Sequence, residues 1–493
     1  MYYPDKKEFE ALCGKGNVIP VYREFLADLD TPISAFLKVD KGDYSYLLES
    51  VEGGENMARY SFLGSSPSLI IKSKGNEITF SRSGRHDTFK TDDPVEEVRK
   101  YMSKFKFVNV KGLPRFSGGL VGYLGYDMVR FMEHLPDKNP DDLNMPDMFF
   151  ILTDTILIFD HVDHKIKVVS NCLVEKDTPH DAYEKACRKI DDMIERLEKP
   201  FDPPGHAAAD GSRSTSVSNF TEEDFCGIVR EAKEYISSGE IIQVVLSQRI
   251  KRSTNADPFS IYRALRSVNP SPYMYYMKMG DSRIIGSSPE ILVRCEDRVV
   301  TTRPIAGTRR RSGDPERDVL IEEELLSDPK ERAEHIMLVD LGRNDIGRVC
   351  EYSSIETLDL MSIERYSHVI HLVSGVVGKL REGKDVFDVL RATFPAGTVS
   401  GAPKVRAMQI IDELEIVRRG PYAGSLGYIS FSGNMDMCIT IRTIVMKGRD
   451  AYIQAGAGIV MDSVPALEYK ETRNKAMAML KAVDTAEEGL KWS

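Results

Sequence analysis

The stretch RIIGSSPEILVRCE at residues 283–296 contains two short apolar runs typical of strands, with a turn just before Glu290. HVIHLVSGVVGKL at 368–380 has the same strand-like character, whereas PKVRAMQIIDELE at 403–415 has the apolar spacing of a helix. Strands and helices mix here without the regular alternation that builds a doubly wound parallel sheet. We therefore predict an α+β fold in which mixed or antiparallel sheets are layered with helices.

Upstream of this region, a segment rich in Pro, Gly, Ser and Ala, KPFDPPGHAAADGSRSTSVSN at 199–219, interrupts every periodic apolar pattern and predicts a surface linker. The chain of 493 residues also exceeds the ~250–300 residues at which one hydrophobic core stops growing. We therefore predict two domains, 1–204 and 220–487, joined by a linker at 205–219.

The periodicity on each side of the linker predicts further elements. A helix over 220–240 is expected to begin after Thr221 as its N-cap and to stop at Gly239. The remaining predictions are strands at 45–50, 68–73 and 76–83, and helices at 93–105 and 180–198.

Composition excludes several classes of protein. The 66 basic and 76 acidic residues leave a net charge of −10, which repels nucleic acid and anionic membranes. We find no apolar run long enough to span a membrane and no export signal at the start of the chain. The seven cysteines contain no CxxC pair and indicate reduced thiols. We expect a cytoplasmic protein.

Two glycine motifs resemble nucleotide sites only weakly. GKLREGKD at 378–385 is close to a phosphate loop, but Asp385 replaces the hydroxyl that would hold magnesium. QAGAGIVMD at 454–462 lacks the third glycine of a dinucleotide fingerprint. A turn between a strand and a helix is the better interpretation of the first motif.

Glycine, proline and cationic residues are concentrated at TTRPIAGTRRR (301–311) and FPAGTVSGAPKVRAM (394–408). Both stretches could surround a carboxylate with N–H groups and positive charge. In the second, Ser400 is expected to cap and Pro403 to open a helix that offers Lys404. Two ordinary basic loops are an equally good interpretation.

Acidic residues occur in apolar company at AEHIMLVDLGRND (333–345) and LEYKETRNKAMAML (467–480). If the fold brings Glu334 and Glu471 together, the pair suits Mg²⁺, which prefers one or two carboxylates with waters and substrate oxygens. Pairing of Glu471 with Lys475 one helical turn later is the alternative.

Two further residues are candidates for proton transfer. His371 shares a strand face with apolar neighbours, so it is either a hydrogen-bonded core residue or a catalytic group. Glu290 lies at the beginning of a strand; it is a candidate proton donor if burial raises its pKa, and a solvated residue otherwise.

Eight strings in order make a more specific pattern than any single motif: PIAGTRRR, EHIMLVDLGRNDIGRV, YSHVIHLVS, AGTVSGAPKVRAM, GPYAGSLGY, CITIRT, QAGAGIV and KETRNKA. Together they resemble the chorismate-binding enzymes, specifically the anthranilate synthase component I branch. The resemblance is strong over the second half and weak over the first. It implies a catalytic domain preceded by a regulatory domain.

The resemblance also implies roles for individual residues. Glu334 and Glu471 would hold Mg²⁺, Glu290 would protonate the departing hydroxyl of chorismate, and His371 would assist the loss of pyruvate. The implied contacts to chorismate are Gly307, Thr308, Tyr422, Arg442, Gly456, Ala457 and Gly458.

Two positions discriminate within the family. Water-adding members carry a lysine base where this chain has Gln243, and a neutral amide cannot take a proton from water at pH 7. Aminodeoxychorismate-forming members carry a nucleophilic lysine where this chain has Ala306. Both departures favour ammonia as nucleophile and anthranilate as product. Aminodeoxychorismate synthesis and a non-catalytic amino-acid sensor are the alternatives.

Partners and regulation are implied in the same way. We find no glutaminase nucleophile motif, so a separate amidotransferase subunit would supply ammonia, in a heterotetramer of two large and two small subunits. LLES at 47–50 resembles the family's tryptophan feedback site. The implied contacts to tryptophan as inhibitor are Glu49, Ser50, Pro272, Tyr273 and Met274.

Overall fold

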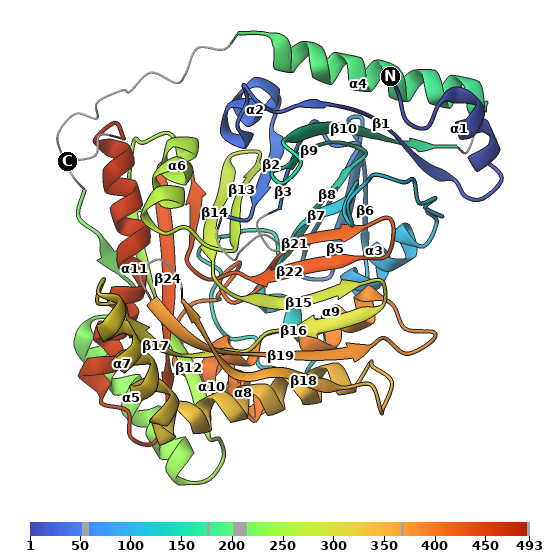
Figure 1. The fold of residues 1–493 in the computed structure, drawn as a ribbon. Coiled ribbons are helices and arrows are strands. Elements are labelled where there is room, and N and C mark those ends of the chain that lie inside the picture. The colour runs from blue at the N-terminus through green and yellow to red at the C-terminus, as the bar shows by residue number, and fades with distance from the viewer. Residues whose placement is uncertain (52–58, 175–177, 201–213, 366–368, 491–493) are drawn as a thin grey trace.

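The centre of the fold is a pair of large antiparallel sheets that pack face to face (Figure 1). The fold comes from a computed structural model that describes residues 1–51, 59–174, 178–200, 214–365 and 369–490. Apolar side chains of both sheets, such as Tyr46 and Tyr275 from the first and Val121 and Leu426 from the second, form one buried cluster between them. The predicted α+β class is confirmed.

Within the described residues each sheet has twelve strands. The first sheet runs, in spatial order, through β1 (Val18–Leu26), β10 (Lys165–Leu173), β9 (Thr155–Asp160), β3 (Tyr60–Ser65), β2 (Tyr44–Glu49), β13 (Tyr273–Met279), β14 (Ser282–Ser288), β23 (Thr443–Lys447), β24 (Asp450–Ile459), β12 (Gln243–Ser253) and β11 (Val217–Ser218), with β20 (Gly401–Ala402) also on β12. The second runs through β17 (Ile305–Arg310), β19 (Val369–Lys379), β16 (Val299–Thr302), β15 (Ile291–Glu296), β22 (Met435–Ile439), β21 (Ser425–Ser430), β7 (Gly119–Leu124), β8 (Met148–Thr153), β4 (Leu69–Lys74), β5 (Glu77–Arg82) and β6 (Arg85–Lys90), with β18 (Glu356–Arg365) on β19.

Helices cover the outer faces of the sheets. α4 lies over β1 and β10 at one end of the molecule, whereas α5, α7, α8 and α10 gather at the opposite end (Figure 1). α11 packs along β24 and α6. The helices are α1 (Lys6–Leu12), α2 (Pro32–Val39), α3 (Pro94–Met102), α4 (Pro179–Glu198), α5 (Glu222–Ser237), α6 (Pro258–Val268), α7 (Pro315–Ser327), α8 (Pro329–Gly347), α9 (Val386–Thr393), α10 (Lys404–Leu414) and α11 (Pro465–Glu487), with short 3-10 turns η1 (Tyr126–Phe131) and η2 (Gly397–Val399).

Both sheets take strands from both sides of the predicted linker. β2 pairs with β13 in the first sheet, and β7 pairs with β21 in the second. Of the predicted linker 205–219, residues 205–213 lie outside the described residues, and β11 near its end pairs with β12. The division into 1–204 and 220–487 stays a prediction, and each sheet runs continuously from one segment into the other.

Most locally predicted elements are confirmed. The helix predicted over 220–240 is α5, whose N-cap Thr221 accepts the Asp224 N–H at 3.2 Å. The phosphate-loop look-alike is a turn between β19 and α9, and Asp385 caps α9 by accepting the Phe387 N–H at 2.9 Å. All seven cysteines are free. No helix among the described residues is both long and apolar enough to cross a bilayer.

One local prediction is wrong. Ser400 does not cap the helix at 403–415; its hydroxyl donates to the Ala396 carbonyl oxygen at 2.8 Å, and Pro403 precedes α10 without a side-chain cap. The Lys404 ammonium is bonded to Asp345 at 2.7 Å, so its charge is already compensated. The reason is that the bend before α10 brings Ser400 back onto the preceding turn.

Candidate functional site

Two helices bring their carboxylates to one end of the first sheet. Glu334 on α8 accepts a hydrogen bond from Gln243 Nε2, the first residue of β12, at 3.3 Å. Burial is the main cause that raises the pKa of Glu334, and the negative charges of Glu331 and Glu471 raise it further. The predicted pair Glu334 and Glu471 therefore lies within electrostatic reach.

Lys475 interacts with both of these acids. Its ammonium pairs with Glu471 at 2.6 Å and donates to the Gly456 carbonyl oxygen at 3.0 Å, and its charge also lowers the pKa of Glu334. The ion pair considered as the alternative role of Glu471 is therefore present. It does not exclude the first interpretation, because a carboxylate has several acceptor positions.

The donor set fits a hard divalent cation. Two carboxylates from different helices lie close enough to repel each other, and a cation bound to both would relieve this repulsion. No group of three or more metal-binding side chains occurs among the described residues. Mg²⁺ commonly takes further oxygen ligands from water or from a substrate.

The Gly456–Ala457–Gly458 segment of β24 has to be small. A Cβ on Gly456 would lie 2.7 Å from the Tyr422 hydroxyl, and a Cβ on Gly458 would lie 2.6 Å from Gln243 Nε2. β23 pairs with β24 only up to Ile453, so in the described structure β23 does not cover this segment. The small residues let Tyr422 and Gln243 close on a backbone that a ligand can approach.

Arg442 carries an uncompensated charge. It lies just before β23 with a φ of 51°, and its Nη1 donates to the Lys475 carbonyl oxygen at 2.6 Å. It forms no ion pair with any described carboxylate, and burial lowers its pKa. A guanidinium in this state is ready to bind a substrate carboxylate with two parallel hydrogen bonds.

Glu290 lies between β14 and β15 and is only 8% exposed. Burial raises its pKa to about 8, against the opposing influences of Thr398 and Lys475. Glu290 and Thr398 line the same small cavity. The carboxyl group is therefore protonated at neutral pH and is suited to act as a general acid.

His371 on β19 is held by a bulge in β17. Its Nδ1 is 3.1 Å from both the Gly307 carbonyl oxygen and the Thr308 hydroxyl. Because a carbonyl oxygen only accepts, Nδ1 carries the proton. Gly307 makes the bulge with a φ of 62°, which favours glycine. Burial lowers the pKa of His371, so the imidazole is neutral at pH 7.

The predicted catalytic, substrate and metal residues thus form one connected cluster. Arg442 acts electrostatically on His371, Glu471 acts on Arg442, and Lys475 acts on Glu290. Ala306, beside the bulge, is 8% exposed and offers no amine. Together with the hydrogen bonds described above, these electrostatic influences connect residues of β12, β17, β19, β24, α8, α11 and the turn before β15.

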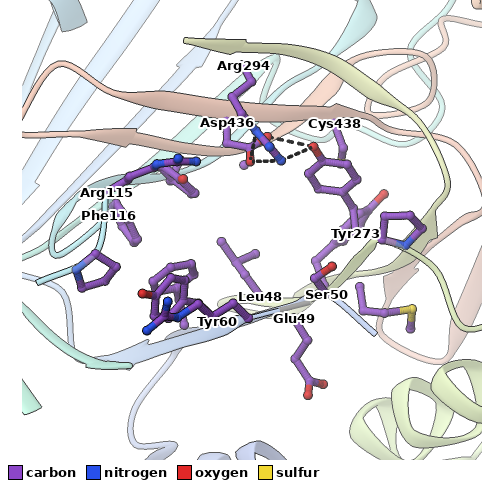
Figure 2. Close-up of a pocket in the computed structure, with 18 of the residues that line it drawn as sticks. Leu48, Glu49, Ser50, Tyr60, Arg115, Phe116, Tyr273, Arg294, Asp436 and Cys438 are labelled. Carbon is purple, nitrogen blue, oxygen red and sulfur yellow. Dashed lines mark hydrogen bonds and ion pairs between the residues drawn. The ribbon is translucent and has the colours of Figure 1, made fainter. Parts of the chain in front are cut away.

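A separate cavity of about 700 Å³ lies between the two sheets. All five predicted effector residues, Glu49, Ser50, Pro272, Tyr273 and Met274, line it. We call it the effector cavity. Figure 2 shows Arg294, Asp436 and Tyr273 linked by hydrogen bonds on its wall; Tyr273 donates to Asp436 at 2.9 Å, and Arg294 Nε to the same carboxylate at 2.9 Å.

The carboxylate of Glu49 points away from this cavity (Figure 2). It accepts from the Tyr262 hydroxyl and pairs with Arg266 at 3.2 Å. The contact of Glu49 with tryptophan therefore stays a prediction, and in this structure its carboxylate is bonded on the other side of β2. The reason is that successive residues of β2 alternate sides, and Glu49 contacts Tyr262 and Arg266 of α6 instead.

Sequence reasoning missed several lining and linking residues. The sequence predicts Lys475 only as an ion-pair partner of Glu471, and Thr398 only as part of the stretch 394–408. Tyr428, Asp436 and Cys438 line the effector cavity. Tyr428 and Cys438 belong to the strings GPYAGSLGY and CITIRT, but nothing in those strings says which sheet face they occupy, because that depends on pairing with distant strands.

Comparisons with known proteins identify the family of the chain. The profile of the family described as chorismate binding enzyme matches residues 43–481. "Anthranilate synthase component 1" of Acetivibrio thermocellus is 50% identical over 99% of this chain and 100% of that protein, and the one of Aquifex aeolicus is 52% identical over 98% of both. The crystal structure of anthranilate synthase component I from Streptococcus pneumoniae TIGR4 superposes with a TM-score of 0.77 at 38% identity, covering 92% of this chain and 98% of that one.

Proposed function

The chain belongs to the chorismate-binding enzyme family, and from that premise we propose that it is the large subunit of an anthranilate synthase. The reaction converts chorismate and ammonia to anthranilate, pyruvate and water, the first step of tryptophan biosynthesis. The observation that carries the proposal is Gln243, a neutral amide bonded to Glu334 at 3.3 Å. A water nucleophile would need a base there, whereas ammonia needs none.

The binding groups follow from the charges of the site. Arg442, the Tyr422 hydroxyl and the backbone of Gly456–Gly458 would hold carboxylates of chorismate, with Thr308 and Gly307 on the other side of the ring. Glu334 and Glu471 would hold Mg²⁺. When bound, Mg²⁺ would orient a substrate carboxylate and stabilise its charge.

The proton transfers use groups whose protonation states suit them. Glu290, protonated at neutral pH, donates to the departing hydroxyl at C4 while ammonia attacks C2. The neutral His371 then takes the proton at C2 as the enolpyruvyl group leaves and becomes pyruvate. Ala306 offers no amine, so no covalent adduct forms at that position.

Ammonia would come from a separate glutamine amidotransferase. The relatives are named component 1, which supports a second component. We propose a heterotetramer of two large and two small subunits in the cytoplasm. On its own, the chain would use ammonium at high pH, where more of it is NH₃.

The effector cavity would bind L-tryptophan as a feedback inhibitor. Aromatic walls from Tyr60, Phe116, Tyr273 and Tyr428 suit an indole, and paired charges on the wall suit a zwitterion. Inhibition requires that tryptophan prefer a conformation that binds or turns over chorismate poorly.

Incubation of the purified chain with chorismate, Mg²⁺ and ammonium tests the reaction. We expect the fluorescence of anthranilate to rise together with pyruvate, and both to require Mg²⁺. A 4-amino product without release of pyruvate would instead identify an aminodeoxychorismate synthase. Binding of tryptophan without any turnover would identify a non-catalytic sensor.

A further inference from the structure

The turn that carries Glu290 is also a crossing between the two sheets. The chain leaves the first sheet at Ser288, the last residue of β14, and enters the second at Ile291, the first residue of β15. A second crossing lies beside it, because β22 of the second sheet continues through Arg442 into β23 of the first. Glu290 and Arg442 therefore both lie where the chain passes between the sheets.

Hydrogen bonds tie these two crossings together. The Ser288 side chain is completely buried, and its hydroxyl donates to the Ile439 carbonyl oxygen at 2.7 Å. Ile439 N–H donates in turn to the Glu290 carbonyl oxygen at 3.0 Å. Ser287 N–H, one residue earlier, donates to the Arg442 carbonyl oxygen at 3.1 Å.

Ser288 also contacts the backbone of Glu290 directly. The Glu290 N–H donates to the Ser288 oxygen at 3.4 Å, and the Glu290 carbonyl oxygen is 3.3 Å from it. A hydroxyl has a single proton, and the shorter distance assigns that proton to Ile439. The Ser288 hydroxyl oxygen thus accepts from the Glu290 N–H, and its proton is donated to the Ile439 carbonyl oxygen on β22. With the bond from Ile439 N–H to the Glu290 carbonyl oxygen, these hydrogen bonds form a ring around the backbone of the general acid.

The effector cavity borders this ring on two sides. Ser288 lies opposite Tyr273 in the register of β14 and β13, and Ile291 lies opposite Cys438 in the register of β15 and β22. Tyr273 and Cys438 both line the cavity, and the bond from Tyr273 to Asp436 joins β13 to β22 across the sheets. A ligand that changes the spacing of the two sheets would act on the crossings.

We propose that Ser288 is a positioning residue, which fixes Glu290 against β22 and transmits occupancy of the effector cavity to Glu290 and Arg442. The inference rests on the proposed function, because it takes Glu290 as the general acid and tryptophan as the cavity ligand. Two sites that contact the same pair of crossings can shift the same conformational equilibrium, and allosteric coupling requires such a shared equilibrium.

The test compares Ser288→Ala with wild type in the full chain, with ammonium as nitrogen source, saturating Mg²⁺ and a constant concentration of free NH₃. We expect kcat to fall about tenfold while the KM for chorismate changes less than about threefold, because the acid is displaced rather than lost. We expect the half-inhibitory tryptophan concentration to rise about tenfold, with the calorimetric Kd for tryptophan within about threefold of wild type.

Ser282→Ala is the matched control. Ser282 is buried at the other end of β14, and its hydroxyl donates to Asp281 at 3.0 Å, away from Glu290. It should leave kcat and inhibition unchanged. Ser288→Cys keeps a similar volume and a weak hydrogen-bond donor, so its kcat and its half-inhibitory tryptophan concentration should lie between those of wild type and Ser288→Ala. If the alanine variant does not fold, the cysteine variant provides the test.

Wild-type kcat and wild-type inhibition in Ser288→Ala would overturn the inference, as would equal losses in Ser282→Ala. Absence of tryptophan binding to the wild-type chain would refute the transmission of cavity occupancy to Glu290 and Arg442. The kcat of Ser288→Ala alone would then decide whether Ser288 positions Glu290. Absence of anthranilate from the wild-type chain would instead refute the proposed function.

Discussion

The effector cavity and the catalytic cluster differ in whether their charged side chains are paired with groups of opposite charge. Each arginine that lines the cavity has an acidic partner: Arg294 pairs with Asp436, Arg59 with Asp160, and Arg115 with Glu296. In the catalytic cluster Arg442 forms no ion pair with any described carboxylate, and the carboxyl of Glu290 is buried without a cation bonded to it. This difference supports the proposed net-neutral ligand of the cavity and the proposed anionic substrate and cation of the cluster, in which Glu471 is paired with Lys475.

The largest expected effect comes from removing an acid from the cluster. Glu334→Gln and Glu471→Gln should each reduce Mg²⁺-dependent anthranilate formation by about a thousandfold or more, because one carboxylate cannot replace two as ligands of the ion. Steady-state assays over a series of Mg²⁺ concentrations measure the loss.

Glu323→Gln, an exposed position on α7, is the control and should keep full activity. The thermal midpoint of Glu334→Gln should not fall at pH 7, since the raised pKa of Glu334 means that its charge is unfavourable in the folded chain. Near-normal turnover in either glutamine variant would refute the assignment of the cation site.

The next effect concerns the general acid. Glu290→Gln should reduce kcat by about a hundredfold to a thousandfold, the usual contribution of general acid catalysis. In the wild-type chain, kcat at constant free NH₃ should fall as the pH rises through about 8, because Glu290 then loses its proton. A pH profile in which kcat stays constant to pH 10 would contradict this role.

The raised pKa of Glu290 also makes the stability of the folded chain depend on pH. The folded-state pKa of Glu290 lies above the unfolded value, so between about 4.5 and about 8 the unfolded chain releases a proton that the folded chain retains. The contribution of Glu290 to stability is therefore present at low pH and is lost as the pH rises through this window. The thermal midpoint of Glu290→Gln should exceed that of wild type by more at pH 9 than at pH 5.

A smaller effect is expected at the unpaired arginine. Arg442→Gln should raise the KM for chorismate about tenfold to a hundredfold, because each hydrogen bond to a charged group contributes roughly 1.5–3 kcal/mol. The unfolding free energy in urea should stay equal or rise, since the variant removes a buried charge without an acidic partner. A marked loss of stability with an unchanged KM would show that Arg442 is structural.

The smallest effect on ligand binding is expected at Glu49. Because its carboxylate faces Tyr262 and Arg266, Glu49→Gln should change the calorimetric Kd for tryptophan less than about threefold. Weaker hydrogen bonds to the buried side chain at position 49 should lower stability by about 1–3 kcal/mol. A change in Kd of tenfold or more would mean that Glu49 turns into the cavity when the ligand binds. The effector cavity and the catalytic cluster would then differ less in the pairing of their charged side chains.

Local patterns predicted much of the fold. The strands at 45–50, 68–73 and 76–83 and the helices at 93–105, 180–198 and 220–240 follow from side-chain periodicity and capping, which act over a few residues. The cap at Ser400 could not be predicted in this way, because the backbone bend that redirects its hydroxyl depends on neighbouring elements. The partner of Glu49 was missed for the same reason, since α6 lies far along the chain.

The sequence by itself determined the chemistry available at each position: an amide rather than a base at Gln243, no amine at Ala306, and glycine at 456 and 458. It also determined that these residues resemble one family. Tertiary structure alone decided which charges meet, that Lys475 acts on both acids, and that Glu290 and Arg442 occupy neighbouring crossings. The physical reason is that residue type is a local property, whereas burial, pairing and pKa depend on groups that only the folded sheets bring together.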